Sequence, residues 1–113
     1  MFKKAKSFAI FPFRVFYMFV EDGTTPLLAG FGASAKNFKK AVNRNRIKRL
    51  TREAYRLQKS ELYETLEKHN SQLALFFIYT GKEIPLYTLV KEKMGIILQR
   101  LISILNENRS SPA

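Results

Sequence analysis

The sequence predicts an α+β fold, a two-layer sandwich in which helices pack on a four-stranded mixed sheet. The chain begins with short apolar and aromatic runs separated by turn residues, a pattern typical of strands. It continues with two long segments whose apolar residues recur three and four positions apart, as in amphipathic helices, and with one further strand between them. At 113 residues we expect a single domain over 1–113, with 1–6 and 107–113 frayed.

Three strands are expected before the first helix. They cover residues 7–11, 13–20 and 27–35. Pro12 separates the first two because proline cannot donate a hydrogen bond to a strand ladder. Residues 21–26 form a turn by composition. Gly30 and Gly32 weaken the third strand and mark a place where a backbone or a ligand can approach closely.

The remaining elements are expected to be a helix, a strand and a helix. Residues 39–68 contain neither glycine nor proline, so we predict a helix there with a kink or a restart at Ser60. Its apolar stripe is Ile47, Leu50, Ala54 and Leu57. The continuous apolar run 73–79 predicts a central strand buried on both faces. A turn over 81–85 leads into a final helix over 86–105.

Positive charge is concentrated in one segment. The formal net charge of +11 predicts a polyanionic partner, either nucleic acid or an anionic membrane. Residues 36–59 hold ten basic residues and one acid, Glu53, whereas the other 89 residues hold ten basic and eight acidic ones. Like charges three and four positions apart destabilise an isolated helix. This repulsion favours the interpretation that the segment binds an anionic ligand over the interpretation that it is only a solvent-exposed helix face.

The cations gather on one side of the expected helix. Opposite the apolar stripe lie Asn45, Lys48, Arg49, Arg52, Arg56 and Lys59, and Arg44 and Arg46 flank it. Guanidinium groups pair with phosphate oxygens through two parallel hydrogen bonds and also stack on bases. This segment therefore predicts a nucleic-acid-binding helix whose row of guanidinium groups faces outward.

Other classes of site find no support in the sequence. Cysteine is absent, which excludes disulfides and thiolate metal sites and is typical of cytoplasmic proteins. His69 is the single histidine and has no obvious carboxylate partner, so we expect no metal site and no catalytic residue. No apolar stretch reaches roughly 18 residues, and Pro12 and Arg14 interrupt the N-terminal one. We expect a cytoplasmic protein without a membrane partner.

The predicted strand over 13–20 is apolar on both faces, so both are expected to be covered. One face must meet the helices. The other carries Arg14, Phe16 and Met18, and we interpret it as an RNA face because unpaired bases stack on aromatic rings beside cations. Burial of all these side chains in the core is an equally good interpretation.

Residues 41–56 resemble the arginine-rich signature of the bacterial ribonuclease P protein family, A-V-x-R-N-R-x-K-R-x-x-R-E. The nine defined positions are matched by Ala41, Val42, Arg44, Asn45, Arg46, Lys48, Arg49, Arg52 and Glu53. Residues 33–37 resemble the strand end that leads into the family's helix. Residues 2–7 resemble its F-x-x-G-x-S stretch, with Ala5 in place of the common glycine. The resemblance covers almost the whole chain.

The resemblance implies both a fold and a function. The fold would be that of the second domain of a small-subunit ribosomal protein, with a left-handed β-α-β crossover through the basic helix. The protein would be the non-catalytic subunit of an endoribonuclease. It would bind the catalytic RNA of ribonuclease P and the 5′ leader of precursor transfer RNA. Chemistry and Mg²⁺ would belong to the RNA, with no cofactor on the protein and no obligate protein partner.

The resemblance also assigns residues. The RNA-contacting set would be Arg44, Asn45, Arg46, Lys48, Arg49 and Arg52, to which we add Lys36 and Arg56. The leader would lie in a cleft between the basic helix and the sheet, lined by Phe2, Arg14, Phe16 and Met18. Family members usually begin with a helix before the F-x-x-G-x-S stretch. Because Met1 stands almost at that stretch, we expect the helix to be missing, and part of the cleft to be either absent or supplied differently.

Two other hypotheses remain open. One is a ribosomal or ribosome-assembly RNA-binding protein of the same fold, which would recover ribosomal RNA rather than one catalytic RNA. The other is a membrane-surface protein, which would need exposed apolar residues opposite its lysines. The narrow apolar stripe is needed for the sheet, so we rank the membrane hypothesis last.

Overall fold

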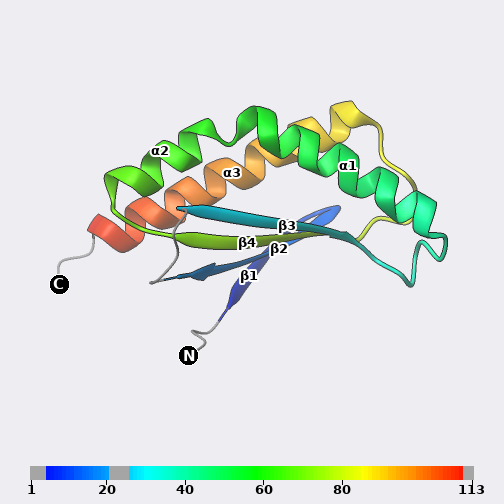
Figure 1. Ribbon diagram of the computed structural model, residues 1–113, viewed down its shortest axis with the longest axis horizontal. Coiled ribbons are helices and arrows are strands. Elements are labelled where there is room, and N and C mark those ends of the chain that lie inside the picture. Colours follow the sequence, from blue (N-terminus) through cyan, green and yellow to red (C-terminus); the bar gives the residue numbers. More distant parts are fainter. Residues whose placement is uncertain (1–4, 21–25, 111–113) are drawn as a thin grey trace.

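The computed structural model describes residues 5–20 and 26–110 and has the predicted α+β architecture, with three helices on one side of a four-stranded sheet (Figure 1). The strands are β1 (Lys6–Ile10), β2 (Phe13–Phe19), β3 (Leu27–Ala33) and β4 (Leu73–Tyr79). The helices are α1 (Ala41–Gln58), α2 (Ser60–Lys68) and α3 (Tyr87–Ser110). The predicted fold class and order of elements are confirmed.

The sheet is mixed, in the order β1-β2-β4-β3. β2 pairs antiparallel with β1 and with β4, whereas β3 pairs parallel with β4. β4 is therefore central, as predicted. The connection from β3 through α1 and α2 to β4 joins two parallel neighbours and is the expected crossover through the basic helix. Its left-handed sense stays a prediction.

The hydrophobic core lies between the sheet and the helices. Alternate residues of β2 and β4, beginning with Phe13 and Leu73, point toward the helices, and Val15 and Phe77 among them are fully buried. α3 supplies a buried stripe at spacings of four, three, four and four, which is Val90, Met94, Ile97, Leu101 and Leu105. Each such side chain contributes about 1.5–3 kcal/mol by leaving water, so this layer holds the sheet against α3.

The opposite side of the sheet carries no helix among the described residues, which corrects two predictions. β4 was expected to be buried on both faces, but Phe76 keeps 42% of its surface exposed, and Ala74 and Ile78 are only half-buried. Phe16 and Met18 of β2 are half-buried on the same side. The apolar character of this face therefore does not indicate a second protein layer.

The helical stripe of α1 is rotated from the predicted one. Ile47 and Ala54 are buried, but Leu57 keeps 57% of its surface exposed and Tyr55 is buried instead. The ring of Tyr55 lies 5.6 Å from that of Phe31 in β3, and this contact turns α1 toward the edge strand. Thr51 is also buried, because its hydroxyl donates to the carbonyl of Ile47 within the helix.

Several boundaries differ from those predicted. The first helix begins at Ala41 rather than at residue 39, whereas the restart predicted at Ser60 is confirmed, since α1 ends at Gln58 and α2 begins at Ser60. β3 ends at Ala33 because the next residues fold into a turn, in which the amide of Phe38 donates to the carbonyl of Ser34. Lys6 belongs to β1, and α3 continues to Ser110, beyond the predicted helix end at residue 105. The fraying expected at 1–6 and 107–113 stays a prediction.

Candidate nucleic-acid interface

α1 presents most of its cations to solvent, on the face opposite the core. Of the residues predicted to contact RNA, those that are exposed are Lys36, Asn45, Arg46, Arg49, Arg52 and Arg56, and Lys48 is half-buried. Within the described part of the chain, Glu53 is the one acid that pairs with them. The predicted outward row is therefore present from Asn45 onward.

Arg44 has a different environment from the other arginines. It is half-buried, and its Nη1 donates to the carbonyls of Phe38 at 2.7 Å and Lys39 at 3.0 Å. These carbonyls belong to the loop that enters α1, and Lys40 at the start of the helix provides no side-chain cap. Arg44 thus braces the entry of the helix, and its predicted contact with RNA stays a prediction.

Arg52 is held over an aromatic cluster at the sheet edge. Its guanidinium carbon lies 5.5 Å from the centre of the Phe31 ring, and that ring stacks on Phe77 at 5.5 Å with 12° between the planes. An exposed cation–π contact of this kind contributes about 0.5–1 kcal/mol. It fixes the guanidinium beside β3 while the side chain remains exposed to solvent, so a phosphate or base finds it already oriented.

Arg56 forms an ion pair with Glu53 one helical turn earlier. The atoms Nη2 and Oε2 are 2.7 Å apart, and Nε and Oε1 are 3.4 Å apart. Both side chains are exposed, so the pair contributes little to stability. The Glu53 carboxylate thereby occupies two donors of Arg56 that would otherwise be open to an anionic ligand.

The open side of the sheet forms the second candidate surface. Phe16 of β2 and Phe76 of β4 are direct partners across the strands. A Cβ added to Gly30 would lie 2.6 Å from Cδ1 of Phe76, and one added to Gly32 would lie 3.2 Å from its Cζ. The Phe76 ring therefore lies over the two glycines of β3. We call these four residues, with Met18, the aromatic face.

A shallow hollow opens on this surface. Its volume is about 200 Å³, and its lining is Ala5, Phe16, Tyr17, Met18, Ala74, Leu75 and Phe76. Arg14 lies on the same side of the sheet, exposed, with its Nη1 3.4 Å from the hydroxyl oxygen of Ser7. Flat rings beside a cation and a small apolar hollow suit a stacked, unpaired base.

The two surfaces do not form walls of one cleft. α1 packs on the side of the sheet that carries Phe31 and Phe77, whereas Arg14, Phe16 and Met18 point away from it. The expected cleft between the basic helix and the sheet is therefore wrong for these three residues. Their contact with a leader stays a prediction, and Phe2 lies outside the described residues.

The sequence reasoning missed Phe76, which it assigned to a fully buried strand. The available signal was the pair Gly30 and Gly32, which marked a close approach without identifying the approaching group. The structure shows that this group is the Phe76 ring.

Two tyrosines and the single histidine make contacts within the fold. Burial raises the pKa of Tyr55, and burial together with the charge of Glu83 raises the pKa of Tyr79. His69 Nε2 lies 3.1 Å from Oδ1 of Asn106.

Over residues 5–20 and 26–110, no three His, Cys, Asp or Glu side chains gather as metal ligands would. None of the helices in those ranges has the length and apolarity needed to cross a bilayer.

Comparison with known proteins gives a consistent result. The family model named Ribonuclease P matches residues 1–100. A ribonuclease P protein component from Porphyromonas gingivalis is 33% identical over 102 residues, covering 89% of this chain and 74% of the relative. One from Chlorobaculum tepidum is 37% identical over 84 residues, covering 69% of this chain and 54% of the relative.

A solved structure supports the fold. The RNase P protein of Staphylococcus aureus superposes with a TM-score of 0.66 at 21% identity, covering 86% of this chain and 81% of that one. The outward arginine row, the matched signature and these similarities agree. The chain belongs to the bacterial ribonuclease P protein component family, the protein subunit of an endoribonuclease.

Proposed function

We propose that this protein binds the catalytic RNA of ribonuclease P through the exposed face of α1 and binds the unpaired 5′ leader of precursor transfer RNA on the aromatic face. It thereby assists removal of the leader in the cytoplasm. Mg²⁺ and the hydrolytic chemistry are assigned to the RNA subunit. The observation that carries the proposal is the outward row of arginines in α1, with Glu53 as its one acidic neighbour among the described residues.

The division between the two surfaces follows from their chemistry. Structured RNA presents phosphates and hydroxyls along its grooves, and guanidinium forks pair with phosphate oxygens bidentately. The exposed face of α1 offers guanidinium groups at Arg46 and Arg49, with no aromatic ring between them on which a base could stack. Single-stranded RNA presents unstacked bases, which bind aromatic rings. Phe16 and Phe76 offer those rings on the other side of the sheet.

The protein's contribution under this proposal is electrostatic and positional. Arginines that replace condensed cations on phosphates lower the concentration of Mg²⁺ that the RNA needs to fold and to hold its substrate. A leader stacked on the sheet adds affinity for the precursor that the mature product lacks. Family membership favours this function over a role in ribosome assembly.

The leader contact is tested by comparing two substrates. The reconstituted enzyme with Phe16→Ala should bind precursor transfer RNA about tenfold more weakly, because stacking on an aromatic ring contributes about 1–3 kcal/mol per base. Its affinity for mature transfer RNA, which has no leader, should be unchanged. An equal loss for both substrates would show that the substitution acts through the catalytic RNA or the fold, and would refute the leader assignment.

A further inference from the structure

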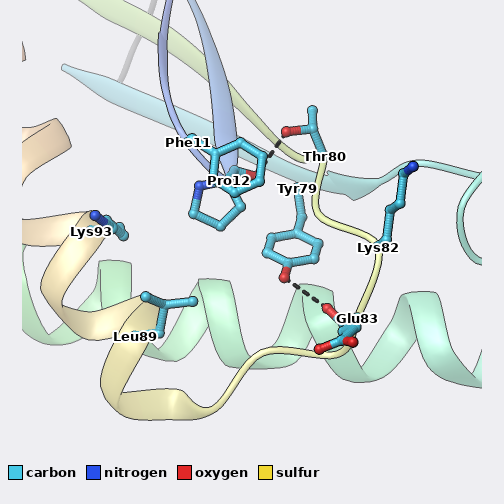
Figure 2. Close-up of a pocket in the computed structure, with 8 residues that line it drawn as sticks. All are labelled: Phe11, Pro12, Tyr79, Thr80, Lys82, Glu83, Leu89 and Lys93. Carbon is cyan, nitrogen blue, oxygen red and sulfur yellow. Dashed lines mark hydrogen bonds between the residues drawn. The ribbon is translucent and has the colours of Figure 1, made fainter.

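A second hollow lies at the end of the sheet, where the β1–β2 turn, the segment after β4 and the first turns of α3 meet (Figure 2). Its volume is about 550 Å³, within the roughly 300–1,000 Å³ of small-molecule sites. The lining residues are Phe11, Pro12, Tyr79, Thr80, Lys82, Glu83, Leu89 and Lys93. We call it the terminal pocket. Neither surface of the proposed function includes it.

The walls of the terminal pocket are fixed by hydrogen bonds. The hydroxyl of Tyr79 donates to the carbonyl of Glu83 at 2.7 Å, as Figure 2 shows. The amide and the hydroxyl of Thr80 both donate to the carbonyl of Pro12, at 2.7 and 3.0 Å. A Cβ at Gly81 would lie 2.5 Å from the Tyr79 hydroxyl oxygen, so a side chain at this position would displace the Tyr79 ring. The pocket is thus formed before any ligand arrives.

The lining combines an aromatic ring, an apolar wall and charge. Phe11 keeps 76% of its surface exposed at the β1–β2 turn, although it lies next to a core strand. Pro12 and Leu89 supply apolar surface, while Lys82 and Lys93 supply two cations. Single exposed apolar residues are common and need no explanation. An exposed ring beside two lysines and a preformed hollow has the composition of a site for an unstacked nucleotide.

The terminal pocket is joined to the basic surface of α1. The side-chain amide of Asn37 donates to the carbonyls of Thr80 and Gly81, at 3.1 and 3.2 Å. This ties the loop before α1 to the rim of the pocket. That loop carries three exposed lysines, which are Lys36, Lys39 and Lys40. Positive charge therefore continues from the start of α1 across this loop to Lys82, with no described acid on the loop.

We propose that the terminal pocket binds one unpaired nucleotide of an RNA strand whose neighbouring phosphates contact the loop before α1. The base stacks on Phe11, and Lys82 and Lys93, which lie on opposite sides of the pocket (Figure 2), hold the phosphates on its two sides. The Glu83 carboxylate accepts a hydrogen bond from a base amino group or a ribose hydroxyl. The inference rests on the proposed function, because it takes the strand to continue from RNA bound by α1.

The test uses the full chain labelled with ¹⁵N and a single-stranded RNA hexamer of mixed sequence as the probe. Amide signals of Thr80, Lys82 and Leu89 should shift together with those of α1. Phe11→Ala should weaken binding measured at the pocket signals about tenfold, as expected for one lost stacking contact. Lys82→Gln, which changes an exposed side chain, should weaken it in the same way.

Leu86→Ala is the matched control, because Leu86 is also 76% exposed and lies outside the lining. Circular dichroism should show all three variants folded, since each altered side chain is exposed. Pocket signals that stay unmoved while α1 signals saturate would overturn the inference and leave the proposed function standing. So would equal affinities for Phe11→Ala and Leu86→Ala. Absence of shifts along α1 would also overturn the inference, because it takes the strand to continue from that helix. The proposed function concerns structured catalytic RNA on α1 and is tested by the salt dependence of that binding.

Discussion

Arg44 and Arg49 occupy one helix and one sequence motif, yet the structure predicts opposite consequences when each is replaced by alanine. Arg49 is exposed, and its side chain makes no hydrogen bond or ion pair with any residue that the structure describes. Its loss should leave the free energy of unfolding within about 0.5 kcal/mol of the unchanged protein. Arg44 donates to two backbone carbonyls at the entry of α1. Its loss should cost about 1.5–3 kcal/mol, as for hydrogen bonds with a charged partner.

The effect of Arg49→Ala on RNA binding is set by counterion release. Each phosphate contact contributes roughly 0.7–0.9 to the slope of log affinity against log salt. A rise from 50 to 200 mM salt is fourfold, so one contact accounts for about a threefold loss of affinity over that range. Arg49→Ala should bind catalytic RNA more weakly at low salt, and its salt-induced loss should be about threefold smaller. Arg46→Ala should behave in the same way.

Fluorescence anisotropy with labelled catalytic RNA gives the slope, and urea unfolding gives the stability. Lys68→Ala, which removes an exposed cation at the end of α2, is the control and should change neither quantity. The reasoning is refuted if Arg49→Ala keeps the full salt slope, or if it destabilises the fold as much as Arg44→Ala does.

Three further predictions concern the sheet, the ion pair and the core. Gly30→Ala places a Cβ 2.6 Å from Cδ1 of Phe76 and should displace that ring. In a filter-binding assay, the variant should bind leader-containing precursor about fivefold more weakly and should bind mature transfer RNA as before. Glu53→Gln should release Arg56 with a stability change under about 1 kcal/mol in urea unfolding, and RNA affinity should hold or rise; a clear fall would contradict this. Burial raises the pKa of Tyr55 above its usual 10.0, so the free energy of unfolding should hold below pH 10 and fall above it, as the unfolded phenol ionises first. Urea unfolding at pH 9 and 11 checks this, and Tyr55→Phe should lessen the fall.

Element types were accessible from the sequence because periodicity and turn residues agreed. The apolar run at 73–79 matches β4 in both bounds. The rotation of α1 was not accessible, because the apolar residues of this helix permit more than one buried stripe. The choice depends on rings that come from distant segments, since Tyr55 packs against Phe31 of β3 and Phe77 of β4 and leaves Leu57 outside.

The candidate site was accessible only in outline. The signature identified the basic helix but treated its arginines alike, because nothing in the motif shows that Arg44 reaches carbonyls five and six residues upstream. The alternation in β2 correctly grouped Arg14, Phe16 and Met18 on one side of the sheet. It could not show that α1 packs on the other side, since that placement depends on the crossover from β3 to β4. Under the proposed function, RNA bases cover the aromatic face, on which no helix of residues 5–20 and 26–110 packs.

The proposed function is tested most directly by cleavage of precursor transfer RNA by the catalytic RNA over a range of Mg²⁺ concentrations, with and without the purified protein. The protein should accelerate 5′ trimming at low Mg²⁺, and a variant with Arg46, Arg49 and Arg52 changed to alanine should fold but lose most of that acceleration. Cleavage unchanged by the protein at every Mg²⁺ concentration would contradict the account, as would full acceleration by the triple variant.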